Sequence, residues 1–201
     1  MSTKPSKLRI TKTLLDSWLY SFIRDDGYED FLRTLNREKS PPTEQMLLGQ
    51  QFENCINNVM DGAIIDESHK WYRAVTEVAE YVKGAQKQVN LFADITVDDQ
   101  PILLHGVLDY LRAGVIFDCK FSRNYHLNKY LTSTTQHPLY MALVPEARRF
   151  EYLCSDGTYI YKEVYPREIV PSIEPTIRQF LKYLDKHGLM EIYKEKWSVS
   201  S

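Results

Sequence analysis

The stretch 106–122, GVLDYLRAGVIFDCKFS, decides the fold of this chain. It holds two apolar runs separated by the short turn 112–114, a pattern typical of two adjacent strands in a sheet. Each run nevertheless carries charge, with Asp109 in the first and Asp118 and Lys120 in the second. A buried charge without a partner is very costly. We therefore expect these groups to be paired with one another, solvated in a cleft, or bound to a cation.

The two-residue period of a strand arranges these charges. Asp118 and Lys120 point to one face of their strand, and Cys119 between them points to the other. Because the turn is short, Asp109 can lie across the strand pair from Asp118, so that two carboxylates and one ammonium converge at one end of the sheet. Carboxylates suit Mg²⁺ or Mn²⁺, which also take water and phosphate oxygens as ligands. Lys120 could orient or deprotonate an attacking water, or neutralise charge on a pentacovalent phosphate.

The composition is that of a soluble globular protein. The chain has 201 residues, of which 43% are hydrophobic and 26% charged, enough for one sizeable domain. No apolar run approaches the roughly 18 residues of a membrane span, and no secretory signal is visible. Three widely spaced cysteines without a CxxC pair, Cys55, Cys119 and Cys154, suit reduced thiols. We expect a cytoplasmic protein that does not contact a membrane.

The formal net charge of −2 restricts the function. It argues against a protein that coats nucleic acid through bulk positive charge. It does not exclude an enzyme acting on nucleic acid, because an acidic metal site offsets local basic patches in the sum.

The rest of the chain is predicted to mix helices and strands. Helices are expected at 11–35, at 44–60 after Thr43 as N-cap, at 69–83, around 136–144, and from 168 to 197 with interruptions at Pro171, Pro175 and Gly188. Strands are expected at 88–95, 101–111, 115–121, 149–154 and 159–164. This order predicts an α/β (α+β) fold whose mixed central sheet is flanked by helices. We expect one domain, with a helical N-terminal part (1–85), a sheet core (86–165) and a C-terminal helix (166–201).

Two motifs in the opening stretch resemble those of the PD-(D/E)XK nuclease superfamily. Gly106 and Asp109 form G-x-x-D, and Asp118 and Lys120 form D-x-K on the following strand. Leu108 stands where the motif has its proline, a residue often missing in this superfamily.

Three further segments resemble the RecB-like, phage-type exonuclease branch of that superfamily. The sequence QHPLY (136–140) matches its Q-x-x-x-Y motif. GQQFEN (49–54) carries Glu53 where these nucleases place an acidic or histidine metal ligand, and TKTLLDSWLYS (11–21) is similar to the helix that opens RecB-type nuclease domains. Pro138 is acceptable within the first turn of a helix. The cysteine set of the iron–sulfur members is absent, so we expect no iron–sulfur cluster.

The resemblance implies a restriction-endonuclease-like core and a metal site with Mg²⁺ or Mn²⁺. Asp109 and Asp118 would be the principal ligands, with the backbone carbonyl of Cys119 as a further one. Glu53 would complete the site from its helix. It lies about 100° round that helix from Phe52, beside the apolar stripe rather than on it, so a surface glutamate is the alternative. Lys120 would be the catalytic lysine.

The resemblance also implies contacts with DNA. Gln136 and Tyr140, four apart on one helical face, would hold the DNA backbone and support the lysine. The alternative is that Tyr140 is a core residue and Gln136 faces solvent. Arg123 and Lys129 follow the catalytic strand and are the expected phosphate contacts.

These features together predict a metal-dependent deoxyribonuclease, of the phage-type exonuclease kind, that serves recombination or DNA processing. Its partner would be DNA, with a homo-oligomer or a recombination partner protein left open. Two other classes are alternatives: a catalytically silent nuclease-fold subunit or inhibitor that binds DNA or protein, and a metal-dependent endonuclease or phosphoesterase of small nucleotides.

Overall fold

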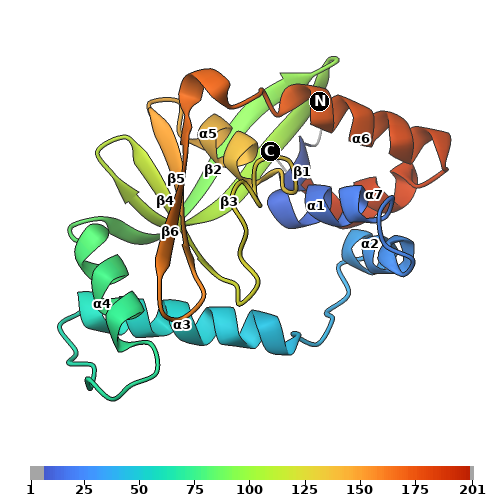
Figure 1. The fold of residues 1–201 in the computed structure, drawn as a ribbon. Helices are drawn as coiled ribbons and strands as arrows, with labels where there is room; N and C mark the ends of the chain where they lie inside the picture. Colours follow the sequence, from blue (N-terminus) through green and yellow to red (C-terminus); the bar gives the residue numbers. More distant parts are fainter. Residues whose placement is uncertain (1–6, 200–201) are drawn as a thin grey trace.

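A seven-stranded mixed sheet forms the centre of the computed structural model, which describes residues 7–199, and helices cover it (Figure 1). The strands are β1 (Lys7–Thr11), β2 (Gln86–Val97), β3 (Gln100–Arg112), β4 (Val115–Phe121), β5 (Arg149–Ser155), β6 (Ile160–Pro166) and β7 (Ser198–Val199). The helices are α1 (Lys12–Tyr20), α2 (Gly27–Leu35), α3 (Glu44–Met60), α4 (Tyr72–Tyr81), α5 (Gln136–Leu143), α6 (Glu174–Lys186) and α7 (Met190–Trp197). The predicted α/β (α+β) class, a mixed central sheet flanked by helices, is confirmed.

The central strand β3 changes partners along one of its edges. The strands follow the order β6-β5-β4-β3-β1-β7, and β2 pairs antiparallel with β3 along nearly its whole length on the other edge. β1 pairs in parallel with residues 102–105 of β3, and β4 pairs antiparallel with residues 110–112. In this pairing, residues 106–109 of β3 have no neighbouring strand on the edge shared by β1 and β4. The sheet is therefore open at the segment that contains the G-x-x-D motif.

Two hydrophobic cores lie against the sheet. The larger joins α1, α2, α5, α6 and α7, with Trp18 packed edge to face on Phe180. The smaller joins α3 and α4 to β4, with Phe52 packed edge to face on Trp71. Ile116 belongs to the larger core and the next residue of β4, Phe117, to the smaller one. Because neighbouring residues of a strand point to opposite faces, the two cores flank β4 from opposite sides.

Several predicted elements have the expected bounds. α3 covers Glu44–Met60, and the Thr43 side chain caps it by accepting a hydrogen bond from the Met46 N–H at 3.2 Å. β4 covers Val115–Phe121, and the predicted hairpin is formed by β2 and β3.

Other elements differ from the prediction. The single helix expected at 11–35 is two helices separated by the turn 21–26. Gly27 begins α2 close against the end of α1, where an added Cβ would lie 2.4 Å from the Tyr20 carbonyl oxygen. The interrupted helix expected from 168 to 197 is a 3₁₀ turn (Arg167–Ile169) followed by α6 and α7, which separate at the expected weak point Gly188, with φ +68°. Residues 200–201 of the expected C-terminal part lie outside the described residues. β1 and β7 were not predicted, and they pair with each other.

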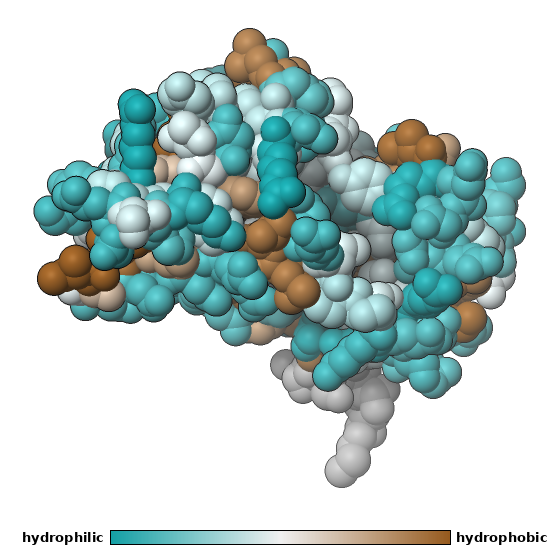
Figure 2. Space-filling view, turned by 60° about the horizontal axis from the view of Figure 1, so that its bottom comes forward, coloured by the Kyte–Doolittle hydropathy of each residue, from teal (hydrophilic) through white to brown (hydrophobic). Residues whose placement is uncertain are grey.

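Polar side chains cover most of one face of the molecule (Figure 2). The face in Figure 2 is largely hydrophilic, with its hydrophobic side chains in separate small groups. Among the described helices, none combines the length and the apolar character that crossing a bilayer requires.

Gly106 provides a test of how closely α5 packs on β3. A Cβ at this position would lie 2.7 Å from Cε1 of Tyr140 and 2.8 Å from Cδ1 of Leu143. We expect Gly106→Ala to lower the free energy of unfolding by about 1–3 kcal/mol, as overpacking does in cores, measured by urea unfolding. Gly49→Ala is the control: no atom lies within 4 Å of that Cβ, so the substitution should stabilise α3 by up to about 1 kcal/mol. Equal stability of the Gly106→Ala variant and the natural protein would contradict the close packing.

Candidate active site

The candidate site lies where β3 exchanges β1 for β4. The β3–β4 ladder ends at the pair Tyr110 and Phe117, and the next pair in this register would be Asp109 and Asp118. The Asp109 side chain replaces the missing ladder contact, because its Oδ2 accepts a hydrogen bond from the Cys119 N–H at 2.9 Å. Asp109 is thereby held beside the D-x-K segment of β4.

Asp118 is the most deeply buried charge of the site, with 1% of its surface exposed. Its Oδ2 lies 2.6 Å from Nζ of Lys120, and its Oδ1 accepts a hydrogen bond from Nε2 of Gln136. Apart from the ion pair, Oδ2 accepts no hydrogen bond among the described residues, and the buried Oε1 of Gln136 also has no partner there. The site therefore contains two buried oxygens with unused acceptor capacity.

Glu53 approaches this cluster from α3. Its side chain is partly buried, and Oε1 accepts a hydrogen bond from Nε2 of Gln88 on β2 at 2.5 Å. Burial raises the pKa of Glu53, and the negative charge of Asp118 raises it further. The predicted third carboxylate thus lies within electrostatic reach of Asp118, on the partly buried side of α3.

The charges of the site act strongly on one another. Burial raises the pKa of Asp109 well above its usual value, and the charges of Asp118 and Glu53 add to this effect. Burial alone would lower the pKa of Lys120, but the charges of Asp118 and Asp109 outweigh it and raise that pKa. With all three carboxylates ionised, the single ammonium leaves an excess of negative charge in a poorly solvated site.

The three carboxylates each use a protein donor in this arrangement. Asp109 is bonded to the Cys119 N–H, Asp118 to Gln136, and Glu53 to Gln88. Over residues 7–199, no three His, Cys, Asp or Glu side chains converge closely enough to hold a metal ion as they stand. Side-chain rotation away from these donors would be needed to bring the carboxylate oxygens to one point.

Gln136 and Tyr140 lie on α5 directly beside the acids. Gln136 is 4% exposed and Tyr140 7%, and the Tyr140 hydroxyl donates to the Val107 carbonyl at 2.9 Å. Val107 belongs to the segment of β3 without a neighbouring strand on that edge, so Tyr140 satisfies its backbone there. The predicted pair is therefore turned into the protein, toward β3 and Asp118. Pro138 lies in the first turn of α5, where backbone N–H groups have no intrahelical acceptor, so its lack of an N–H removes no helical hydrogen bond.

The segment between β4 and α5 carries the predicted phosphate contacts. Arg123 is exposed, whereas Lys129 is half-buried and its Nζ donates to the Ser122 hydroxyl at 2.7 Å. The buried carboxylate of Glu163 on β6 holds this segment by accepting from the Lys129 N–H at 3.1 Å and the Tyr125 hydroxyl at 2.8 Å. The sequence analysis missed Glu163, because its partners precede it by more than thirty positions.

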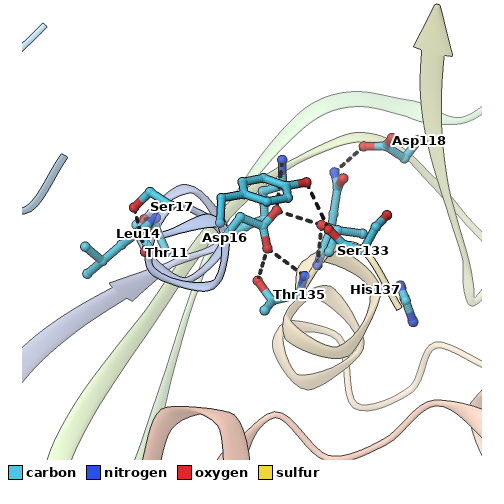
Figure 3. A network of polar contacts seen from close by, with 12 residues as sticks. Thr11, Leu14, Asp16, Ser17, Asp118, Ser133, Thr135 and His137 are labelled. Atoms are coloured by element: carbon cyan, nitrogen blue, oxygen red, sulfur yellow. Dashed lines mark hydrogen bonds and ion pairs between the residues drawn. The ribbon is translucent and has the colours of Figure 1, made fainter. Parts of the chain in front are cut away.

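Asp16 on α1 is a second buried carboxylate that the sequence analysis missed. It is 5% exposed and points at the residues that precede α5 (Figure 3). It accepts hydrogen bonds from the Thr135 N–H at 2.7 Å, the Thr135 hydroxyl at 2.8 Å and the Thr134 hydroxyl at 2.7 Å. A detectable signal existed, since Asp16 lies between the core residues Leu15 and Trp18.

Comparison with solved structures supports the fold. The crystal structure of SSO0001 superposes with a TM-score of 0.54 and 16% identity, over 89% of this chain and 79% of that chain. LHK-Exo in complex with dAMP superposes with a TM-score of 0.52 and 14% identity, over 93% of this chain and 92% of that chain. No known protein family and no curated protein matches the sequence. At these identities the likeness concerns the fold alone.

His137, next to the site residue Gln136, makes stability depend on pH. It is 2% exposed, it stacks on Tyr165, and burial lowers its pKa to about 4. Because the unfolded chain has the higher histidine pKa, near 6.5, the unfolded state binds more protons as the pH falls below that value. The contribution of neutral His137 is therefore complete above about pH 6.5 and is lost as the pH falls toward 4. Between pH 7.5 and pH 5 the loss should be about 2 kcal/mol.

This pH effect is measured by urea unfolding at the two pH values. We expect a variant with His137→Gln to lack about 2 kcal/mol of the change shown by the natural protein. The exposed His126 provides the control, and His126→Gln should retain the whole change. An unaltered pH dependence in the His137 variant would contradict a neutral buried imidazole.

Proposed function

We propose that this chain is a divalent-metal-dependent deoxyribonuclease that hydrolyses phosphodiester bonds, acting as an exonuclease on DNA ends in recombination or DNA processing. The observation that carries the proposal is the grouping of Asp109, Asp118 and Lys120 where β3 changes partners, with Glu53 within electrostatic reach of both aspartates. The likeness of the fold to LHK-Exo, solved in complex with dAMP, supports a nuclease and favours an exonuclease.

The donor set fits a hard divalent cation. Asp109, Asp118 and Glu53 would hold Mg²⁺ or Mn²⁺, joined by the backbone carbonyl of Cys119. Carboxylate and carbonyl oxygens are the ligands these ions prefer. Two features of the site support the assignment. Apart from its ion pair with Lys120, Oδ2 of Asp118 accepts no hydrogen bond among the described residues, and burial together with the neighbouring carboxylate charges raises the pKa of Asp109 and of Glu53. A bound cation would polarise the scissile phosphate and lower the pKa of a coordinated water.

The remaining groups would act on the substrate or on the acids. The Lys120 ammonium, beside Asp118, would neutralise negative charge on the phosphate that is attacked. Gln136 would hold the Asp118 carboxylate in one orientation, and Tyr140 would keep the open segment of β3 in place. Arg123 and Lys129 would contact backbone phosphates, which position DNA without reading its sequence.

The proposal is tested by incubating the protein with linear, closed-circular and single-stranded DNA in the presence of Mg²⁺. We expect cleavage of linear DNA that stops when EDTA is added. Asp118→Asn and Lys120→Met should each lower the cleavage rate by at least about 100-fold, because each removes a charge at the reacting phosphate.

Matched controls on the surface separate loss of chemistry from loss of charge. Asp98→Asn and Lys83→Met remove exposed charges that belong to exposed ion pairs, and both should leave the rate unchanged within about twofold. Cleavage that survives Asp118→Asn would refute the proposed site. Binding of DNA without cleavage would indicate a silent nuclease-fold protein, and cutting of closed circles would indicate an endonuclease.

Metal binding is testable through stability. Glu53→Gln removes one of three mutually repelling carboxylates, so we expect it to raise the melting temperature of the metal-free protein by a few degrees. Mn²⁺ should raise the melting temperature of the natural protein, since a ligand of the folded state stabilises it, and should raise that of the Glu53→Gln variant less. Glu44→Gln, on the exposed first turn of α3, is the control that should keep the full response to Mn²⁺. An equal response in both variants would exclude Glu53 as a ligand.

A further inference from the structure

We propose that Asp16 is a positioning residue of the active site, which fixes the N-terminal turn of α5 and so keeps the Gln136 amide on Asp118. This inference rests on the proposed nuclease function, and it assigns a role to a residue outside the motifs. Among the described residues, the hydrogen bonds of Asp16 go to Thr134 and Thr135, so it acts through the residues that lead into α5.

The start of α5 lacks the usual cap. The residue at the N-cap position, Thr135, makes no side-chain hydrogen bond to the helix. Asp16 from α1 supplies acceptors instead, and its Oδ1 takes both the Thr135 N–H and the Thr135 hydroxyl. A carboxylate at this end of a helix also interacts favourably with the helix dipole. The orientation of the first turn of α5 is therefore set from another helix.

A second contact carries this effect to Gln136. The Thr134 hydroxyl donates to Oδ2 of Asp16 at 2.7 Å, and its oxygen accepts the Gln136 N–H at 3.1 Å. The Gln136 side chain then donates to Asp118 (Figure 3). Asp16 is thus linked to Asp118 through Thr134 and Gln136 by three hydrogen bonds, the backbone of Gln136 receiving the link and its side chain passing it on.

The α1 helix is itself held firmly enough to serve as a support. β1 leads directly into α1 and pairs with β3, and its last residue, Thr11, caps α1 by accepting from the Leu14 N–H at 3.3 Å. One turn beyond Asp16, the Tyr20 hydroxyl donates to the Ser133 carbonyl at 2.9 Å. Two side chains of α1 therefore hold the segment 133–135 at adjacent points.

The effect on the reaction should be specific. Outer partners of metal-binding side chains typically contribute about 10–100-fold to affinity or activity. Loss of Asp16 frees the turn that carries Gln136, so Asp118 loses a fixed donor while the surface that meets DNA is unchanged. We expect kcat to fall and KM to stay the same.

The test is a double-mutant cycle on cleavage of linear DNA at saturating Mg²⁺. Asp16→Ala should lower kcat by about 10-fold or more, with KM unchanged within about twofold. In a Gln136→Ala background, the same substitution should lower kcat by less than about twofold, because the link it supports is already broken. Asp16→Asn keeps one acceptor oxygen and should recover part of the loss. If Asp16→Ala lowers kcat by the same factor in the Gln136→Ala background as in the natural protein, the proposal is overturned.

Two further variants provide the control and a milder test. Asp30→Asn removes an exposed carboxylate of α2 and should leave kcat unchanged. Thr134→Val breaks the series of hydrogen bonds while leaving the Asp16 contacts to Thr135, and it should lower kcat without affecting KM. If Asp16→Ala fails to fold, the Thr134→Val variant decides the question, and an unchanged kcat there would overturn the proposal.

Amide hydrogen exchange separates this inference from the proposed function. In the metal-free protein, Asp16→Ala should speed exchange in the segment 134–140 and leave α3 unchanged. This readout needs no activity. If the natural protein cleaves no DNA, the nuclease proposal fails, while faster exchange still supports the positioning contact. Unchanged exchange in the Asp16→Ala variant would overturn the role of Asp16 whether or not DNA is cleaved.

Discussion

The exchange of partners along one edge of β3 is the constraint on which the site depends. A strand that leaves one neighbour before it reaches the next must satisfy its backbone by other means. Here the Tyr140 hydroxyl donates a hydrogen bond to the Val107 carbonyl, and the Asp109 carboxylate accepts one from the Cys119 N–H. The Tyr140 hydroxyl of α5 thus occupies a position that a strand donor would have in a continuous ladder. Polar groups converge at this point because the sheet cannot close there.

The charges of the site follow from the same opening. Asp118 is nearly inaccessible, yet within residues 7–199 its partners are one ammonium and one amide. Two further carboxylates lie near enough to interact with its charge. A fold selected for stability alone would replace such a group with apolar side chains. The cost in stability is understandable if a cation and a phosphate occupy this place during function, because they would complete the balance of charge.

The sequence is informative where local rules apply. The two-residue period of a strand places Asp118 and Lys120 on one face, and their ion pair agrees with that placement. The N-cap at Thr43 marks the start of α3. β1 escapes detection because it is five residues long and its register on β3 is decided by residues more than ninety positions away. The break before α2 is not detectable in the sequence, because the need for glycine at position 27 comes from its close approach to the Tyr20 backbone, which only the folded structure shows. Asp16 and Glu163 are invisible as structural supports for the same reason, since their partners lie on distant segments.

The position of β1 and α1 also bears on when the site can form during synthesis. β1 reaches β3 across more than ninety residues, and the Tyr193 hydroxyl of α7 donates to the Arg9 carbonyl of β1 at 2.8 Å. Trp18 of α1 packs on Phe180 of α6. Contacts between such distant segments form late in folding, since the chain between them must first be ordered. In a nascent chain whose α6 and α7 are still inside the ribosome, the acids of β3 and β4 would lack the support of a fully packed α1. The support that α1 gives to the candidate site would be complete only after α6 and α7 have emerged from the ribosome.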